Sequence, residues 1–339
     1  MKGAIMKSAA IVCFIALTGA VAACGSSDSS SGGSAVDKQD MSLAMFAYAY
    51  DDPWGVAQAE SAEETAKEAG VDLKVFDAAG DAGKQFNQVQ DAVASGQFDG
   101  FVVSAVDGAG ISAAIEDAAA QDIQTVCIGA PCGPDGNGLK PQVDGEIAYV
   151  GVTGKVDGEV QGDLVKQFCK DKDPCQVAYI PGFASSPVDG ARLDAFKSTV
   201  GEDKNIDVVA TAEGGYDQRQ AFQVTQDMLQ ANPDIDLIAA ADDGMALGVE
   251  QAANEAGKDV AIIGNAASKE GVKRVAAGEW LGTSVWLPRS EAREGTNILI
   301  DSLSGKTDFP TAVDIRKKST VGPVVTQENA ADFQSEWGN

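Results

Sequence analysis

Short apolar runs alternate with amphipathic stretches along the first half of the chain. The runs at residues 42–50, 71–78, 98–106 and 123–130 are dense enough in apolar side chains to form buried strands. Between them, the stretches at 56–70, 82–96 and 110–121 carry apolar side chains at helical spacing, and glycine ends the first two. Strands that alternate with helices of about 10–15 residues indicate βαβ units on a parallel sheet.

The alternation breaks at residues 130–146, a Gly/Pro-rich loop, and then resumes. The second series predicts strands at 146–153, 175–182, 206–215, 235–243, 260–266 and 283–288, and helices at 154–169, 188–200, 216–232, 244–257 and 268–278. One more helix is predicted at 290–305, and residues 313–326 are typical of crossing strands. The pattern therefore predicts an α/β fold of two similar lobes, each with about five parallel strands.

The N-terminal stretch differs from everything that follows it. Two lysines precede an apolar run at residues 9–23, which is shorter than the roughly 20 residues that span a bilayer. A basic start, an apolar run and small residues before a cleavage point are typical of a secretory signal. Cys24 directly follows Val-Ala-Ala, so the segment resembles a bacterial lipobox, in which Cys24 is lipidated; an ordinary signal peptide is the alternative.

We therefore predict a lipoprotein signal peptide at residues 1–23 and a Ser/Gly-rich tether at residues 24–40. Such a protein would be lipid-anchored to the cell membrane on its extracytoplasmic face. Membrane contact would be made through the lipid anchor alone.

Composition excludes several classes of function. The net charge is -26, with 51 acidic against 25 basic residues, and such a surface repels the phosphates of nucleic acids. The chain contains no histidine, which excludes Ser-His-Asp and Cys-His nucleophile systems and every His-ligated metal site. We predict no catalytic residue, no metal, no cofactor and no nucleic-acid partner.

Four cysteines remain outside the N-terminal stretch, in two local pairs. Because an exported protein meets an oxidising environment, we predict disulfides between Cys127 and Cys132 and between Cys169 and Cys175. A four-thiolate zinc site is the alternative, although both spacings are looser than those of usual zinc knuckles.

Several stretches of the chain carry a resemblance to a known family. They are DDPWG at 51–55, PGFASSPVDGARLDAF at 181–196, the segment from Gly-Gly-Tyr to Met-Ala-Leu-Gly at 214–248, and 262–280 with TSVWLP after it. Together they resemble the type I periplasmic sugar-binding proteins, the ribose- and galactose-binding group that feeds ABC importers. The resemblance covers residues 42–325.

The resemblance implies two doubly wound, Rossmann-like lobes joined by three crossovers at a hinge. The ligand would bind between the lobes, at the carboxyl ends of the parallel strands. The N-terminal lobe would span 41–152 and 287–314, and the C-terminal lobe would span 153–286 and 315–339.

The resemblance also implies seven ligand-binding residues, which are Asp52, Trp54, Arg192, Tyr216, Asp242, Asn265 and Trp286. The indole of Trp54 offers a flat face that stacks on the C–H bonds of a sugar ring. A planar guanidinium such as that of Arg192 holds two vicinal hydroxyls or a carboxylate. The carboxylates of Asp52 and Asp242 accept hydrogen bonds from hydroxyls.

Three of these assignments have a structural alternative. Trp54 could cover the edge of a lobe, Arg192 could form a surface ion pair, and Trp286 could pack inside the hinge. Of two adjacent carboxylates, we assign ligand contact to Asp242 and the capping of the following helix to Asp243.

The chain departs from the family pattern at three places. An Asp-Arg pair common in sugar binders is replaced by Gly129-Ala130, an Asp by Asn265 or Ala266, and a hinge Gln by Trp286. The pocket has therefore lost hydrogen-bonding groups. We expect a ligand that is smaller, less hydroxylated or more apolar than ribose or glucose.

These observations predict a monomeric, non-catalytic solute-binding protein. It would capture a small neutral solute (a sugar, a polyol or a sugar derivative) by hinge closure and deliver it to the permease of an ABC importer. A sensor that presents the solute to a membrane receptor or kinase is the alternative. A glycosidase is disfavoured because adjacent carboxylates in one turn do not flank a scissile bond.

Overall fold

Two six-stranded sheets organise the chain, and the structure, a computed structural model, describes residues 35–338. The first sheet has the order β11-β5-β4-β3-β1-β2 and is parallel throughout. Its strands are β1 (Ser42–Ala47), β2 (Asp72–Asp77), β3 (Gly100–Val103), β4 (Gln124–Gly129), β5 (Glu146–Gly151) and β11 (Ala312–Asp314). We call this sheet and its helices the first lobe.

The second sheet has the order β12-β10-β9-β8-β6-β7, and only the β10–β12 pair is antiparallel. Its strands are β6 (Cys175–Ile180), β7 (Ile206–Thr211), β8 (Leu237–Ala240), β9 (Ala261–Asn265), β10 (Gly282–Ser284) and β12 (Val324–Val325). This sheet and its helices form the second lobe.

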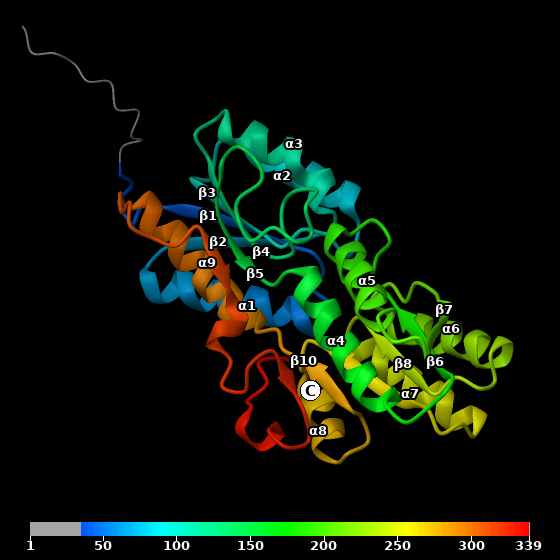
Figure 1. Cartoon of the computed structure of the whole chain (residues 1–339). Coiled ribbons are helices and arrows are strands. Elements are labelled where there is room, and N and C mark those ends of the chain that lie inside the picture. Colours follow the sequence, from blue (N-terminus) through cyan, green and yellow to red (C-terminus); the bar gives the residue numbers. More distant parts are fainter. Residues whose placement is uncertain (1–34, 339) are drawn as a thin grey trace, which may run out of the picture. The chain divides into compact units, whose positions relative to one another are not determined.

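Helices cover both sheets (Figure 1). The first lobe carries α1 (Pro53–Ala69), α2 (Ala82–Ser95), α3 (Gly108–Ala119) and α9 (Pro288–Leu303); α1 packs on α9 and α2 packs on α3. The second lobe carries α4 (Gly154–Cys169), α5 (Pro187–Val200), α6 (Gln218–Ala231), α7 (Asp243–Ala256) and α8 (Lys269–Ala276). Two short 3-10 helices, η1 (Ile315–Lys318) and η2 (Ala330–Asp332), lie in the last segment.

The chain passes between the two sheets three times. The passages lie between β5 and α4, between β10 and α9, and between β11 and β12. The predicted fold class is therefore confirmed: an α/β fold of two doubly wound lobes with parallel-dominated sheets, joined by a three-crossover hinge.

Side-chain caps start most of the described α-helices at the carboxyl ends of strands. The caps are Asp52, Asp81, Asp107, Thr153, Ser186, Asp217, Asp242 and Ser268, each accepting a hydrogen bond from a backbone N–H of the first turn. A short polar side chain satisfies an N–H that the helix itself leaves unpaired. The same geometry places carboxylates and hydroxyls along the edges of the sheets that face each other.

Both predicted disulfides are present. One joins Cys127, in β4, to Cys132 in the following loop, and the other joins Cys169, the last residue of α4, to Cys175, the first residue of β6. With their sulfurs bonded in pairs, the four cysteines are not the thiolates that the alternative zinc site requires.

Element boundaries differ from the predictions where proline and aspartate intervene. α1 begins at Pro53, because proline suits the first helical turn and Asp52 caps it. The strand predicted at 283–288 ends at Ser284, because Pro288 opens α9.

The predicted signal peptide at residues 1–23, the lipidation site Cys24 and residues 24–34 of the tether lie outside the described residues. In the part of the chain that the structure describes, no helix combines the length and the apolar composition needed to cross a membrane.

Candidate functional site

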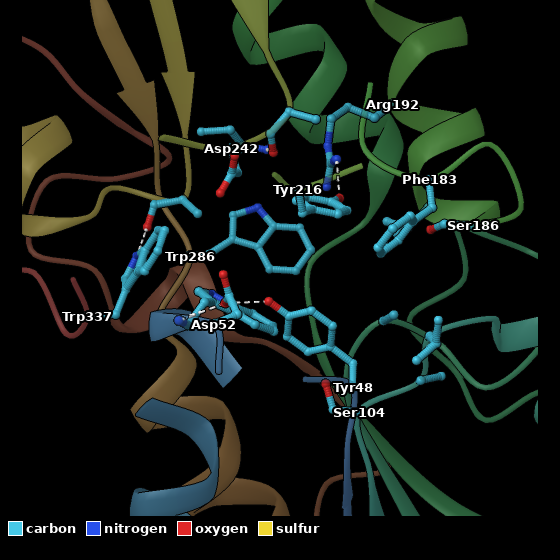
Figure 2. Close-up of a pocket in the computed structure, with 18 residues that line it drawn as sticks. Tyr48, Asp52, Ser104, Phe183, Ser186, Arg192, Tyr216, Asp242, Trp286 and Trp337 are labelled. Carbon is cyan, nitrogen blue, oxygen red and sulfur yellow. Dashed lines mark hydrogen bonds between the residues drawn. The ribbon is translucent and has the colours of Figure 1, made fainter. Parts of the chain in front are cut away.

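A cavity of about 90 Å³ lies where the carboxyl ends of the two sheets face each other (Figure 2). The first lobe contributes Tyr48, Asp52, Trp54, Ser104, Ala105, Val106 and Ala130, and the second contributes Phe183, Ser186, Val188, Arg192, Tyr216, Ala241, Asp242, Asn265 and Ala266. Trp286, from the second crossover, and Trp337, from the last segment, complete the lining. All seven residues predicted to bind the ligand thus line one cavity.

The first-lobe wall consists mainly of aromatic rings and small side chains. The rings of Tyr48 and Trp54 are 5.7 Å apart between centroids, and the ring of Trp54 lies 6.1 Å from that of Trp286. The carboxylate of Asp52 accepts hydrogen bonds from the backbone N–H groups of Trp54 (2.9 Å) and Gly55 (3.2 Å) and from the Tyr48 hydroxyl. Asp52 therefore combines helix capping with a place on the cavity wall.

Asp157 is the centre of a buried network on the opposite side. It lies in the first turn of α4, and its side chain is 0% exposed. Its Oδ2 accepts hydrogen bonds from Arg192 Nε (3.1 Å), Asn265 Nδ2 (3.3 Å) and Trp286 Nε1 (2.6 Å). Its Oδ1 lies 3.5 Å from Nη1 of Arg316 in η1.

This network connects the three crossovers of the hinge. Asp157 follows the first crossover, Trp286 lies in the second and Arg316 lies in the third. The sequence offered no signal for Asp157, because an acidic residue in the first turn of a helix is ordinarily read as a favourable, solvated charge. The packing alternative for Trp286 and the binding prediction are both compatible with its position, since it packs in the hinge and also lines the cavity.

Arg192 is held by a second carboxylate and a phenol. Its Nη1 donates to Asp189 Oδ1 (2.5 Å) and to the Tyr216 hydroxyl (3.2 Å), and that hydroxyl donates to Asp189 (2.7 Å). Only 2% of the Arg192 side chain is exposed, which contradicts the alternative of a surface ion pair. Among the described residues, no hydrogen bond engages its Nη2.

The two adjacent carboxylates after β8 behave differently from the prediction. Asp242 caps α7 by accepting a hydrogen bond from the Met245 N–H (2.7 Å), and it also lines the cavity. Asp243 is fully buried and accepts hydrogen bonds from the Ser268 N–H (2.6 Å) and the Thr283 hydroxyl (2.7 Å). The capping role assigned to Asp243 was wrong, because the extended backbone that a cap requires occurs one residue earlier.

Burial changes the pKa of both carboxyls, those of Asp242 and Asp243. It raises the pKa of Asp242 to about 7 and that of Asp243 to about 7, against the hydrogen bonds that each accepts. Near neutral pH, Asp242 is therefore present in both forms, as a hydroxyl donor and as a carboxylate acceptor, at the cavity wall.

Several lining residues escaped the sequence analysis, namely Tyr48, Ser104, Phe183, Ser186, Val188 and Trp337. Tyr48 follows β1 directly, and Phe183 lies two residues beyond Pro181, so strand-end position was an available signal. The Phe183 ring packs edge-on against Tyr216, with centroids 5.1 Å apart. Trp337 had no comparable signal, since it follows no predicted strand.

The arrangement suits the binding of a small molecule that is partly apolar and partly hydroxylated. The first-lobe side presents aromatic faces, and the second-lobe side combines aromatic rings with fixed donors and acceptors. Among residues 35–338, no group of three or more His, Cys, Asp or Glu side chains is arranged to hold a metal ion.

Comparisons with known proteins agree with this geometry. The family model described as periplasmic binding protein domain matches residues 43–307. The ribose import binding protein of Bacillus subtilis (strain 168) is 26% identical over 272 residues, which cover 80% of this chain and 84% of that protein. The putative rhizopine-binding protein of Rhizobium meliloti is 28% identical over 295 residues, covering 85% and 90% of the two chains.

Solved structures extend the comparison. An ABC transporter solute-binding protein from Mycobacterium smegmatis with bound glycerol is 27% identical, with a TM-score of 0.76 and coverage of 88% of this chain and 99% of that chain. The Caulobacter myo-inositol binding protein, solved with myo-inositol, is 20% identical with a TM-score of 0.77, covering 89% and 98%. The second likeness concerns the fold alone.

Proposed function

This chain belongs to the type I periplasmic sugar-binding proteins of ABC importers, and we propose that its own ligand is a small neutral polyol or short sugar. The protein is a binding component and not an enzyme. The observation that carries the proposal is the cavity, which combines small volume, aromatic faces and fixed hydrogen-bonding groups.

Volume limits the size of the ligand. A cavity of about 90 Å³ has room for several water-sized groups but not for a large ligand. We therefore propose a ligand no larger than a single small sugar or polyol.

Charge balance favours a neutral ligand. The guanidinium groups of Arg192 and Arg316 face the carboxylates of Asp157 and Asp189, so the buried network is already neutral. The carboxyl groups at the wall, those of Asp52 and Asp242, offer an anion no attraction. A strongly anionic solute would therefore meet no uncompensated cation.

Stacking and hydrogen bonding are assigned to different residues of the cavity wall. Trp54 and Tyr216 would stack on the C–H faces of the ligand, while Asp242 and the Nη2 group of Arg192 would bind its hydroxyls. Asn265 would contribute mainly to the shape of the cavity, because its amide already donates to Ala241 O (3.0 Å) and to Asp157. The relatives support a small neutral ligand, since they include a protein named for ribose and a structure with glycerol.

We further propose that the protein is a monomer anchored by a lipid on Cys24 at the extracytoplasmic face, where it delivers the solute to an importer permease. The signal-like residues 1–23 and the tether at 24–40 support this arrangement. A sensor would bind the same solute without promoting uptake. Uptake of the labelled solute by cells lacking this protein separates the two functions, because only loss of a transporter component abolishes it.

Thermal unfolding of residues 34–339, one compact unit, tests the ligand class. The test compounds are glycerol, erythritol, D-ribose and myo-inositol, with succinate and inorganic phosphate as anionic controls. A ligand at 100 times its Kd stabilises the folded state by about 2.7 kcal/mol, which is readily seen as a higher Tm. We expect stabilisation by a neutral polyol and none by the anions. Stabilisation by succinate or phosphate alone would contradict the proposal.

A further inference from the structure

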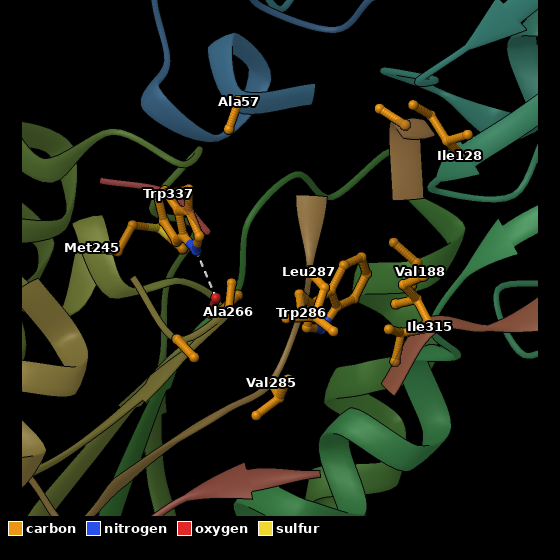
Figure 3. Packing of buried hydrophobic residues seen from close by; sticks show 14 of the residues in the cluster. Ala57, Ile128, Val188, Met245, Ala266, Val285, Trp286, Leu287, Ile315 and Trp337 are labelled. Carbon is orange, nitrogen blue, oxygen red and sulfur yellow. Dashed lines mark hydrogen bonds between the residues drawn. The ribbon is translucent and has the colours of Figure 1, made fainter. Parts of the chain in front are cut away.

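The last described segment, residues 334–338, lies against both lobes. We call it the tail segment. Its Trp337 is buried, with 6% of the residue exposed, and its indole forms part of the cavity wall (Figures 2 and 3). The matched family model ends at residue 307, so the tail segment lies outside the part of the chain that the model matches.

On the second lobe, the tail segment is fixed by side-chain and backbone hydrogen bonds. Trp337 Nε1 donates to Ala266 O (2.6 Å), and the Lys269 N–H at the start of α8 donates to Trp337 O (3.0 Å). The Ser335 hydroxyl donates to Ala267 O (2.7 Å). The indole is therefore held as a fixed wall, because its ring nitrogen and its backbone oxygen are both engaged.

The backbone beneath the indole is unusual. Ala266 and Ala267 have φ angles of 82° and 49°, in the left-handed region that residues with a Cβ rarely adopt. Surrounding contacts must stabilise such a conformation, and the tail segment accounts for two of them. The shape of the cavity beside Ala266 thus depends on the tail segment.

On the first lobe, the tail segment is attached through Glu336. Its carboxylate accepts hydrogen bonds from the N–H of Ser290 (2.9 Å) and from the Ser290 hydroxyl (2.5 Å). Ser290 lies in the first turn of α9, and α9 packs against α1 of the first lobe. Neighbouring residues of one short segment therefore contact opposite sides of the cleft.

We propose that the tail segment is a clasp across the cleft and that the indole of Trp337 sets the upper size limit of the ligand. This inference rests on the proposed function, because it concerns the same cavity. Tryptophan has the largest side chain, and its position on the wall excludes the ring atoms that a hexose or an inositol has beyond a short polyol. The carboxylate of Glu336 keeps the wall in place while the lobes are closed.

Calorimetry with glycerol, erythritol, D-ribose and myo-inositol tests the size limit in three variants. Trp337→Ala should change the affinity ratio of myo-inositol to erythritol in favour of myo-inositol by about tenfold or more, the range expected when a pocket gains or loses apolar volume. Trp337→Phe keeps a ring on the wall and should give a smaller change. Glu336→Gln should weaken binding of all compounds without changing their order, because the wall remains.

The result that would overturn the size limit is an unchanged affinity ratio of myo-inositol to erythritol in Trp337→Ala, provided that this variant unfolds at the wild-type temperature. If Trp337→Ala does not fold, Trp337→Phe and Glu336→Gln provide the test. The size limit predicts a changed affinity ratio of myo-inositol to erythritol in Trp337→Phe and an unchanged ratio in Glu336→Gln.

Hydrogen exchange of the ligand-free protein tests the clasp independently of any solute. The Lys269 amide, which donates to Trp337 O, should exchange faster when residues 334–339 are removed. Unchanged protection would overturn the clasp. If the wild-type protein binds none of the four compounds while this protection is lost on truncation, the proposed ligand class is wrong and the clasp is not.

Discussion

The two walls of the cavity differ in composition and in the groups that they offer to a ligand. The first-lobe wall consists of the aromatic rings of Tyr48 and Trp54 with small residues between strand ends, and its one carboxylate, Asp52, is engaged as a helix cap. The second-lobe wall is built on Asp157 and Arg192, which are 0% and 2% exposed and pair with each other. One wall offers surface to the ligand, and the other offers polar groups fixed before the ligand arrives.

The difference predicts how the walls respond to mutation. Charges buried in a network are stabilising only while their partners remain, because an unpaired buried charge has lost its hydration. An aromatic ring at the edge of a cavity carries less of the fold, because part of its surface is open to the cavity. Substitutions in the second-lobe wall should therefore reduce stability first, and substitutions in the first-lobe wall should reduce affinity first.

The largest effect is expected from Asp157→Ala. This change leaves Arg192 and Arg316 without their shared carboxylate and releases the indole N–H of Trp286. Breaking a buried ion pair costs about 3–5 kcal/mol, so the urea midpoint of unfolding should fall markedly. Asp157→Asn, which keeps an acceptor of the same shape, should lose less. Wild-type stability in Asp157→Ala would show that the network does not hold the hinge.

A smaller effect, in affinity, is expected from Trp54→Ala. Loss of the stacking face should weaken binding of the best neutral polyol by about 10- to 100-fold, since 1.4 kcal/mol is tenfold. Trp54→Phe is the matched control: it keeps a flat ring, and the Trp54 Nε1 that it removes has no hydrogen-bond partner among the described residues. Calorimetry should give near wild-type affinity for the control. If Trp54→Ala lowers stability more than Asp157→Ala does, the contrast between the walls is wrong.

The fold was predictable because its signals repeat. Most strand-then-helix units carry an apolar run, a short polar cap and a helical pattern, so errors at single boundaries leave the topology unchanged. Asp52 and Asp242, which the family resemblance singled out, lie in the loops that follow β1 and β8. Each lies beyond the carboxyl end of a strand that the local sequence predicts.

The rest depends on contacts between distant segments. Asp157 looks like any acidic residue in a first helical turn, and only tertiary structure brings it to Arg192, 35 positions away. Trp337 reaches the cavity from a segment without periodicity, 71 positions beyond its acceptor, Ala266. The capping role assigned to Asp243 was wrong because a shift of one residue separates the capping position, Asp242, from a buried one.

The pH dependence of stability gives the finest test of the second-lobe wall. Burial raises the folded-state pKa of Asp242 and of Asp243 from 3.8 to about 7. Between these values the folded protein holds protons that the unfolded chain releases. The stabilisation from these groups is therefore complete below the unfolded pKa and is lost as pH rises through about 7.

Asp242→Asn should flatten this decline, because asparagine is neutral at every pH and still caps a helix well. The free energy of unfolding of the variant, measured by urea titration at several pH values from about 5 to 8, should fall less steeply than that of the wild-type protein. Asp243→Asn is the matched neighbour and should flatten the slope as well. Only Asp242→Asn should also change polyol affinity, because Asp243 does not line the cavity. A wild-type slope in both variants would mean that these carboxyls are ionised in the folded protein, and the polar wall would then carry a negative charge that a neutral ligand does not require.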